Sequence, residues 1–153
     1  MKTKFPLIVA AFVALTSLAA CGGGEESAAP PLNLVYAGNP AALTKTDTTV
    51  GTGAEAVAGK YVGVNYAGWL YNEAAADKKG TQFDAGSYKL KLGAGGVIVG
   101  FDQGIVGMKV GGKRTVLIPS NLGYGTNGSP PRIPGNAGLV FEIEVVQVSD
   151  TPL

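Results

Sequence analysis

Apolar and polar residues alternate in three separate segments of the chain. These segments are 61–66, 114–118 and 139–148. In the last of them, Phe141 and Ile143 fall on the opposite face from Glu142. A period of two with one polar face predicts strands of an antiparallel sheet that is buried on one side and wet on the other.

One segment has the spacing of a helix instead. Residues 97–108 carry apolar side chains at three- and four-residue intervals, which predicts one short helix packed on the sheet. The residues that form this stripe are Ile98, Phe101, Ile105 and Met108. Gly104 and Gly107 keep the helix short, because glycine is unfavourable in a helix interior. A sheet that covers a single helix predicts an α+β domain.

The N-terminus has a third pattern. Two lysines precede a nearly continuous apolar run that ends at Ala20, too short for a comfortable transmembrane helix but typical of a signal peptide. The run closes on Leu-Ala-Ala-Cys, which resembles the lipobox of bacterial lipoproteins. We therefore expect a lipoprotein signal peptide at 1–20 and lipidation of Cys21. The alternative is an ordinary secretory peptide with an incidental free cysteine.

Small and polar residues follow the cysteine, with prolines at positions 30 and 31. Such a composition is typical of a flexible tether, so we expect the lipidated cysteine and its tether at 21–42 and the folded domain at 43–150. More than one acyl chain gives durable anchoring to a membrane. Gly22 in place of an aspartate indicates, by analogy with enteric lipoprotein sorting, an outer-membrane location facing the periplasm.

Composition excludes several kinds of chemistry. The chain has 153 residues, of which 46% are apolar, enough for one compact domain. Its 12 basic and 11 acidic side chains leave a net charge of +1, which argues against a nucleic-acid partner. There is no histidine and one cysteine, so Ser-His-Asp chemistry, a zinc cluster and internal disulfides are ruled out. We expect no metal and no cofactor.

Several stretches, taken in order, carry a family resemblance. They are VGTGAEA at 50–56, VNYAGWL at 64–70, QFD at 82–84, VIVGFDQG at 97–104 and GMKVGGKR at 107–114. In order and spacing they resemble the FKBP-type peptidyl-prolyl cis-trans isomerases over residues 43–148. The resemblance implies a curved antiparallel sheet of about five strands wrapped around one short α-helix. It also implies a hydrophobic pocket for a proline ring.

The resemblance assigns residues to that pocket. They are Tyr66, Phe83, Asp84, Tyr88, Val97, Ile98, Phe101, Tyr124, Ile133 and Phe141. Phe101 would form the floor under the proline ring, and the Tyr124 hydroxyl would bond a substrate carbonyl. The Ile98 backbone N–H would hold the carbonyl of the proline residue, and Asp84 would orient polar groups at the rim. On periodicity alone the aromatic residues fit an ordinary core equally well, and Asp84 fits a turn.

The chemistry implied needs no nucleophile. Resonance holds the peptide bond planar with a barrier of about 18–20 kcal/mol. Twisting the amide removes that resonance and lowers the charge on the carbonyl, so an apolar pocket disfavours the planar amide more than the twisted one. Binding of the transition state more tightly than the ground state is then sufficient for catalysis.

The chain departs from the family pattern at the rim. Phe101 stands where many members have tryptophan, Ser129 where histidine is frequent and Arg132 where an aliphatic residue is frequent. The stretch between Asp84 and Tyr88 is short, so a partner that supports the aspartate is expected to be missing. We predict an altered substrate preference, lower activity and weakened binding of macrolides such as rapamycin. Residues 125–138, rich in glycine and proline, would form a flap over the groove.

Two functions remain open at this stage. The first is a lipid-anchored isomerase that accelerates folding of proline-containing polypeptides in the cell envelope. The second is a proline-pocket chaperone or binding module with little turnover. We expect a monomer, because no long helical segment precedes the domain.

Overall fold

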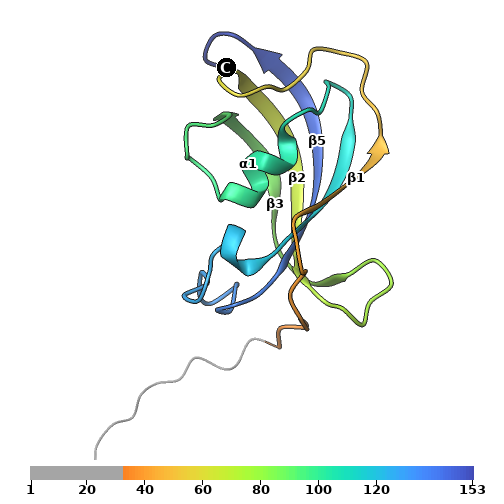
Figure 1. Ribbon diagram of the computed structural model, residues 1–153, viewed down its shortest axis with the longest axis vertical. Helices are drawn as coiled ribbons and strands as arrows, with labels where there is room; N and C mark the ends of the chain where they lie inside the picture. The colour runs from red at the N-terminus through yellow and green to blue at the C-terminus, as the bar shows by residue number, and fades with distance from the viewer. Residues whose placement is uncertain (1–32) are drawn as a thin grey trace, which may run out of the picture. The chain divides into compact units, whose positions relative to one another are not determined.

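The computed structural model describes residues 33–153 and is built mainly of strands (Figure 1). The elements are β1 (Thr44–Thr49), β2 (Tyr61–Tyr71), β3 (Lys79–Lys91), α1 (Val99–Ile105), β4 (Lys113–Ile118), the 3-10 helix η1 (Ser120–Leu122) and β5 (Leu139–Ser149). The expected signal peptide at 1–20, Cys21 and most of the expected tether lie outside the described residues. Within residues 33–153, no helix has the length and apolar character needed to cross a membrane.

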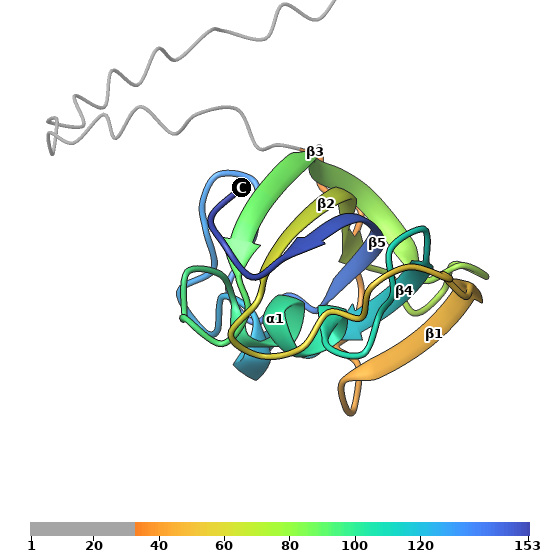
Figure 2. The ribbon, with the colours of Figure 1, turned by 90° about the horizontal axis from the view of Figure 1, so that it is seen from above.

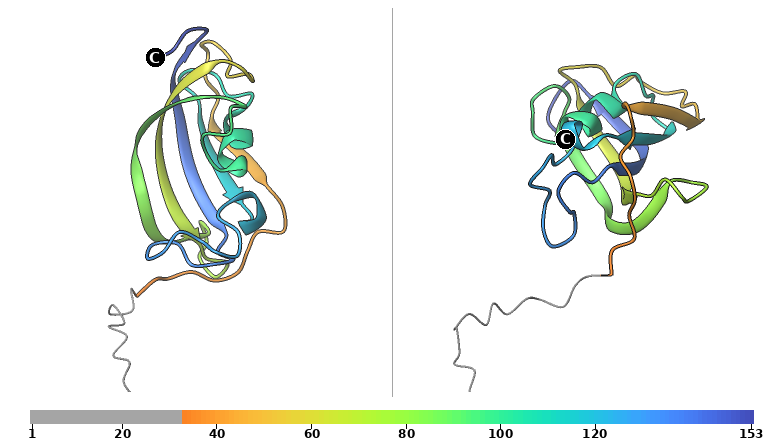
Figure 3. Two further views of the ribbon diagram at one scale, coloured as in Figure 1. Left: turned by 90° about the vertical axis from the view of Figure 1, so that its left-hand side faces the viewer. Right: turned by 60° about the horizontal axis from the view of Figure 1, so that its bottom comes forward.

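All strands join one antiparallel sheet in the order β1-β4-β5-β2-β3, which confirms the predicted fold. The sheet curves around α1 (Figure 2), and Figure 3 shows the helix lying on one face only. At the centre, β2 and β5 pair with Tyr66 opposite Ile143 and Gly68 opposite Phe141. Along β5, buried Phe141 and Ile143 alternate with exposed Glu142. The buried face of the sheet thus packs against α1, as the alternation of apolar and polar residues predicted.

Helix α1 is shorter than the predicted span of 97–108. Its first residue is Val99, because Ile98 has an extended backbone with φ −58° and ψ 145°. Gly107, at φ 85°, adopts the left-handed conformation just after the helix. The apolar spacing misled the prediction because Met108 is 3% exposed and belongs to the core although it lies beyond the helix end.

Two glycines let α1 pack closely on β4. A Cβ on Gly104 would meet the Val116 side chain at 3.0 Å, and one on Gly100 would overlap the side chain of Ile118. Real Cβ atoms do not show the overlap at Gly100, and the contact at Gly104 would be tighter than most real ones, so glycine at these positions permits the close packing of helix and sheet. The close approach fixes the height of Phe101, which lies between the two glycines, above the sheet.

Arg114 joins the helix to two strands and is only 8% exposed. From β4 its Nε donates to Oδ1 of Asp47 on β1 at 2.6 Å. Its Nη1 donates to the carbonyls of Gly104 at 2.9 Å and Val106 at 3.1 Å. These carbonyls at the end of α1 have no helical partner of their own, so one side chain satisfies them and anchors the helix.

The segment 35–39, which we assigned to the tether, is hydrogen bonded to the domain. The Ala37 N–H donates to the Tyr71 carbonyl at 2.9 Å, and the Thr81 N–H donates to the Val35 carbonyl at 2.8 Å. These bonds place the segment beside the ends of β2 and β3. Contacts with the domain therefore begin earlier in the chain than residue 43.

Candidate active site

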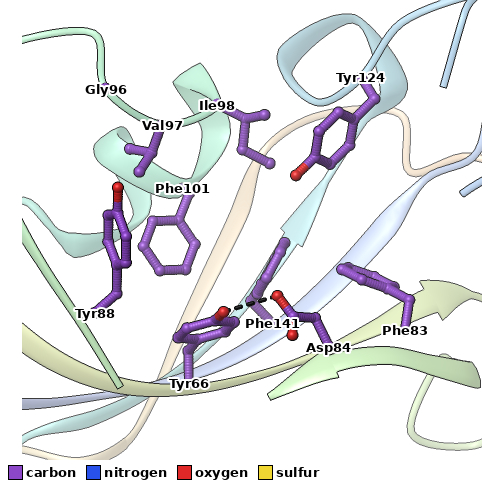
Figure 4. A pocket seen from close by; sticks show the side chains of 10 residues that line it. All are labelled: Tyr66, Phe83, Asp84, Tyr88, Gly96, Val97, Ile98, Phe101, Tyr124 and Phe141. Atoms are coloured by element: carbon purple, nitrogen blue, oxygen red, sulfur yellow. Dashed lines mark hydrogen bonds between the residues drawn. The ribbon is translucent and has the colours of Figure 1, made fainter. Parts of the chain in front are cut away.

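A pocket of about 190 Å³ opens between α1 and the curved sheet (Figure 4). Its lining consists of Tyr66, Phe83, Asp84, Tyr88, Gly96, Val97, Ile98, Phe101, Tyr124 and Phe141. The structure thus brings together every residue that the sequence analysis assigned to the pocket except Ile133. It adds one residue, Gly96.

Four aromatic rings form the apolar part of the pocket. The Phe101 ring lies 5.1 Å from Phe141 and 5.8 Å from Tyr66, measured between centroids, and both pairs are edge to face. Phe83 meets Phe141 at 5.5 Å in the same manner. Such pairs contribute about 0.5–1.5 kcal/mol each beyond their burial. The rings therefore support one another and keep the apolar surface in place without a ligand.

Gly68 on β2 makes room for two of these rings. A Cβ at this position would lie 2.7 Å from Cζ of Phe83 and 2.8 Å from Cε1 of Phe141. Real Cβ atoms do not approach other carbons so closely, so any larger residue would displace both rings. The glycine that the sequence places between Tyr66 and Leu70 is thus a support of the pocket wall.

Asp84 is the only acidic residue in the pocket lining. Its Oδ2 accepts a hydrogen bond of 2.7 Å from the Tyr66 hydroxyl, and its Oδ1 accepts one of 2.9 Å from the Ala85 N–H. Burial, and next the hydrogen bond to the Asp84 carboxylate, raise the pKa of Tyr66 to about 12. Tyr66 therefore stays protonated near neutral pH and continues to donate.

Strand β3 passes directly from Asp84 to Tyr88. Gly86 pairs with Tyr66 and Ser87 pairs with Asn65 in regular register, so no loop separates the two pocket residues. Among residues 33–153, no lysine or arginine forms an ion pair with Asp84. The support of the Asp84 carboxylate described above therefore comes from the Tyr66 hydroxyl and the Ala85 N–H.

Tyr124 approaches the pocket from the segment after η1 (Figure 4). Its side chain is 39% exposed. Burial, and next the negative charge of Asp84, raise the pKa of its hydroxyl. Within the described residues that hydroxyl has no hydrogen-bond partner. The Tyr124 hydroxyl is thus a protonated donor that is available to a ligand, unlike the hydroxyl of Tyr66.

Ile133 differs from the expectation. It is 4% exposed and packs in the hydrophobic core, and it does not line the pocket. Reciprocal backbone hydrogen bonds of 2.8 and 3.0 Å with Ser129 close a narrow turn at the end of the flap. Ile133 therefore anchors the flap to the core. Its neighbour Arg132 instead reaches the pocket wall, donating from Nη1 to the Phe83 carbonyl at 3.1 Å.

Gly96 is the lining residue that the sequence analysis missed. It ends a glycine-rich turn, in which Gly93 and Gly95 have φ of 78° and 76°. The carboxylate of Asp102 on α1 accepts a hydrogen bond from the Gly93 N–H at 3.0 Å. This bond ties the turn to the helix. A run of glycines just before an apolar helix was the available signal.

The fold and the site together define a class of protein, in which a curved antiparallel sheet and one short helix enclose an aromatic pocket with a single carboxylate. A sequence model of the FKBP-type peptidyl-prolyl cis-trans isomerases matches residues 53–146. The chain belongs to this family. It is therefore an enzyme of the peptidyl-prolyl cis-trans isomerase class.

Known proteins agree with this assignment. The chain is 45% identical over 107 residues to an FK506-binding protein of Neisseria meningitidis serogroup B, covering 67% of this chain and 92% of the relative. It is 46% identical over 95 residues to the peptidyl-prolyl cis-trans isomerase FKBP15-1 of Arabidopsis thaliana, covering 61% and 60%. A crystal structure of a peptidyl-prolyl cis-trans isomerase from Pseudomonas syringae pv. tomato superposes with a TM-score of 0.60 at 32% identity, covering 81% of this chain and 85% of that one.

Proposed function

We propose that the enzyme rotates X-Pro bonds by desolvating and twisting the amide in the aromatic pocket, without a covalent intermediate. The observation that carries this mechanism is the composition of the pocket, in which Phe101 and Phe141 provide an apolar surface beside the Tyr124 hydroxyl and Asp84. A planar amide loses hydration on entering such a surface, which costs free energy. The twisted amide is less polar and loses less.

Each pocket group has a role in this proposal. Phe101 is the floor for the proline ring, because it is 5% exposed and touches two other rings edge to face. The Ile98 N–H binds the carbonyl of the proline residue, and no acceptor for it is found within residues 33–153. The Tyr124 hydroxyl binds a substrate carbonyl. Asp84, held by Tyr66, stabilises polar groups of the twisting amide at the rim.

The test measures cis-to-trans exchange of a short X-Pro peptide with the full-length chain in detergent. The comparison is a double variant, Phe101→Leu with Tyr124→Phe, whose fold is checked by circular dichroism. We expect a rate enhancement that the variant loses. Each ~1.4 kcal/mol of differential binding corresponds to a tenfold change in rate. A folded variant with full activity would place the reaction elsewhere.

The competing function, a chaperone that binds proline segments with little turnover, is separated by a second assay. Refolding of a protein that is limited by prolyl isomerisation should become faster with the isomerase. A chaperone would suppress aggregation and leave the slow refolding phase unchanged. The pairing of Asp84 with Tyr66, at 2.7 Å, favours the isomerase because it presets the carboxylate.

We also propose that the enzyme acts on envelope proteins from a lipid anchor at Cys21, on the periplasmic face of the outer membrane, as a monomer. Its support is the leader of residues 1–20 and the lipobox-like tetrad that ends it. The variant Cys21→Ser should move the protein from the membrane fraction to the soluble fraction. Retention of the variant in the membrane would exclude this anchor.

Macrolide binding is a further proposal for the same pocket. Rapamycin would occupy the aromatic surface, with weakened affinity because Ser129 and Arg132 make the flap polar. Arg132 already donates to the Phe83 carbonyl at the wall. The double variant Ser129→His with Arg132→Ile should bind rapamycin more tightly than the wild type in calorimetry. Equal affinity would show that these two residues are not the cause.

A further inference from the structure

A second groove adjoins the proline pocket. Its volume is about 520 Å³, and it shares Phe83 and Asp84 with the pocket. Beyond these two residues it continues to Ala85 on β3 and to Arg132 on the flap. A polypeptide bound with its proline in the pocket can therefore continue into the groove without leaving the protein surface.

Arg132 is an exposed cation that lines this groove and not the proline pocket. Nη1 is held by the Phe83 carbonyl at 3.1 Å, and the next residue, Ile133, is buried in the core. Within residues 33–153 that carbonyl is the one acceptor that the guanidinium contacts, so Nε and Nη2 remain free to donate. Because one hydrogen bond already holds the guanidinium, it loses less side-chain freedom on binding a carboxylate than an unbonded arginine would.

The groove also contains an acidic group, which must be weighed against Arg132. Both oxygens of Asp84 already accept hydrogen bonds, from the Tyr66 hydroxyl and the Ala85 N–H. Asp84 lies at the junction with the proline pocket, whereas Arg132 lines only the groove. The groove thus offers unused positive donors away from the junction. A carboxylate of the bound polypeptide would be attracted by Arg132 in the groove and repelled by Asp84 at the junction.

The direction of a bound polypeptide follows from the proposed function. The carbonyl of the proline residue is assigned to the Ile98 N–H, and Figure 4 shows Ile98 and Asp84 on different sides of the pocket. The chain after the proline then leaves past Ile98. The chain before the proline crosses Phe83 and Asp84 and enters the groove.

We propose that Arg132 makes the enzyme select substrates with an acidic side chain before the proline. Arg132 donates to the carbonyl of Phe83, which lines both cavities, and an extended chain advances about 3.3 Å per residue, so we place the acidic residue at the first or second position before the proline. This inference rests on the proposed function. Because Arg132 is exposed, the preference for glutamate over glutamine should be about twofold to fivefold in kcat/KM.

The experiment compares pairs of proline peptides that differ only by glutamate or glutamine at the first or second position before the proline. The enzyme is the full-length chain in detergent, as wild type, Arg132→Gln and Arg132→Glu. The control is Lys109→Gln, which removes the same charge from an exposed residue outside both cavities. The readout is the ratio of kcat/KM between the two peptides of a pair. A general loss of activity caused by removing the hydrogen bond from Arg132 to the Phe83 carbonyl lowers both values and leaves this ratio unchanged.

We expect wild type and Lys109→Gln to prefer the glutamate peptide, Arg132→Gln to show no preference, and Arg132→Glu to prefer glutamine. High salt should reduce the wild-type preference, because exposed charges are screened. Acceleration of both peptides with an unchanged ratio in Arg132→Gln would overturn the inference and leave the proposed function intact. No acceleration of either peptide by the folded wild type would instead contradict the proposed function.

Discussion

The Tyr66 hydroxyl on β2 donates a hydrogen bond of 2.7 Å to Oδ2 of Asp84 on the neighbouring strand β3. A bond of this length to a carboxylate is charge-assisted and stronger than a neutral one. The bond joins an aromatic wall residue to the only carboxylate in the pocket. The carboxylate lies on the edge strand β3, and its position therefore depends on a residue of the adjacent inner strand β2.

The variant Tyr66→Phe should lower kcat/KM for X-Pro exchange by about tenfold, because a hydrogen bond to a charged group contributes about 1.5–3 kcal/mol and only part of it serves the transition state. The ring remains, so the edge-to-face contact with Phe101 at 5.8 Å is kept. The measurement is peptide exchange by magnetisation transfer. Tyr61→Phe, which removes a hydroxyl outside the pocket, is the control and should retain full activity. Equal activities of the two variants would argue against a role for Asp84.

Gly68→Ala should damage both stability and activity. The added Cβ would lie 2.7 and 2.8 Å from the rings of Phe83 and Phe141, so both rings must move. Overpacking of this kind costs about 1–3 kcal/mol in the free energy of unfolding, which urea titration measures.

The matched control for that prediction is Gly86→Ala. Gly86 lies on the neighbouring strand, opposite Tyr66, and a Cβ there meets nothing within 4 Å. This variant should be as stable as the wild type, apart from the general effect of removing a glycine. If the Gly68→Ala protein is as stable as the Gly86→Ala protein, the Phe83 and Phe141 rings move aside at little cost in free energy, contrary to this prediction.

The sequence predicted the central strands better than the edges. β5 was identifiable because Phe141 and Ile143 are buried and alternate with exposed Glu142. β1 is exposed at every position, so it carries no apolar alternation, and β3 buries only Phe83 and Leu90. Both are edge strands of the sheet. Edge strands escape pattern analysis because few of their side chains reach the core, and only the family resemblance implied their presence.

At the site, the aromatic residues could be assigned only as a group. Phe101 and Phe141 are core residues by burial and pocket residues by position, so the two interpretations of the sequence are both correct for them. The distinction between Arg132 and Ile133 could not be predicted, because it depends on the backbone bonds between Ser129 and Ile133 that set the turn. The requirement for Gly68 depends on rings from two other strands.

The ion pair of Asp47 with Arg114 predicts a pH-dependent stability. The hydrogen bond from Arg114 lowers the pKa of Asp47 below its ordinary value of 3.8. A lowered pKa in the folded state means that the pair stabilises the fold above pH 3.8 and that this stabilisation is lost as the pH falls through the lowered pKa. The difference in free energy of unfolding between wild type and Asp47→Asn should therefore be constant near neutral pH and shrink in acid.

Repeating the Asp47→Asn comparison in Arg114→Lys protein tests whether the Asp47–Arg114 pair causes the pH dependence of stability. Lysine at position 114 keeps the charge but cannot donate to Asp47 and to the carbonyls of Gly104 and Val106 together. In Arg114→Lys protein, the Asp47→Asn substitution should have a smaller effect with a weaker pH dependence. An unchanged dependence would assign it to other acidic groups.

Substitution of Tyr124 should change catalysis without changing stability. Within residues 33–153 its hydroxyl has no hydrogen-bond partner, and the side chain is 39% exposed. Tyr124→Phe should thus leave the free energy of unfolding within about 0.5 kcal/mol of the wild type, as for an ordinary surface change. If the hydroxyl binds a substrate carbonyl, kcat/KM should fall by about threefold to tenfold. Urea titration and peptide exchange on the same preparation measure the two quantities. A loss of stability without a loss of activity would assign the hydroxyl a structural role and leave the Ile98 N–H as the remaining donor to substrate.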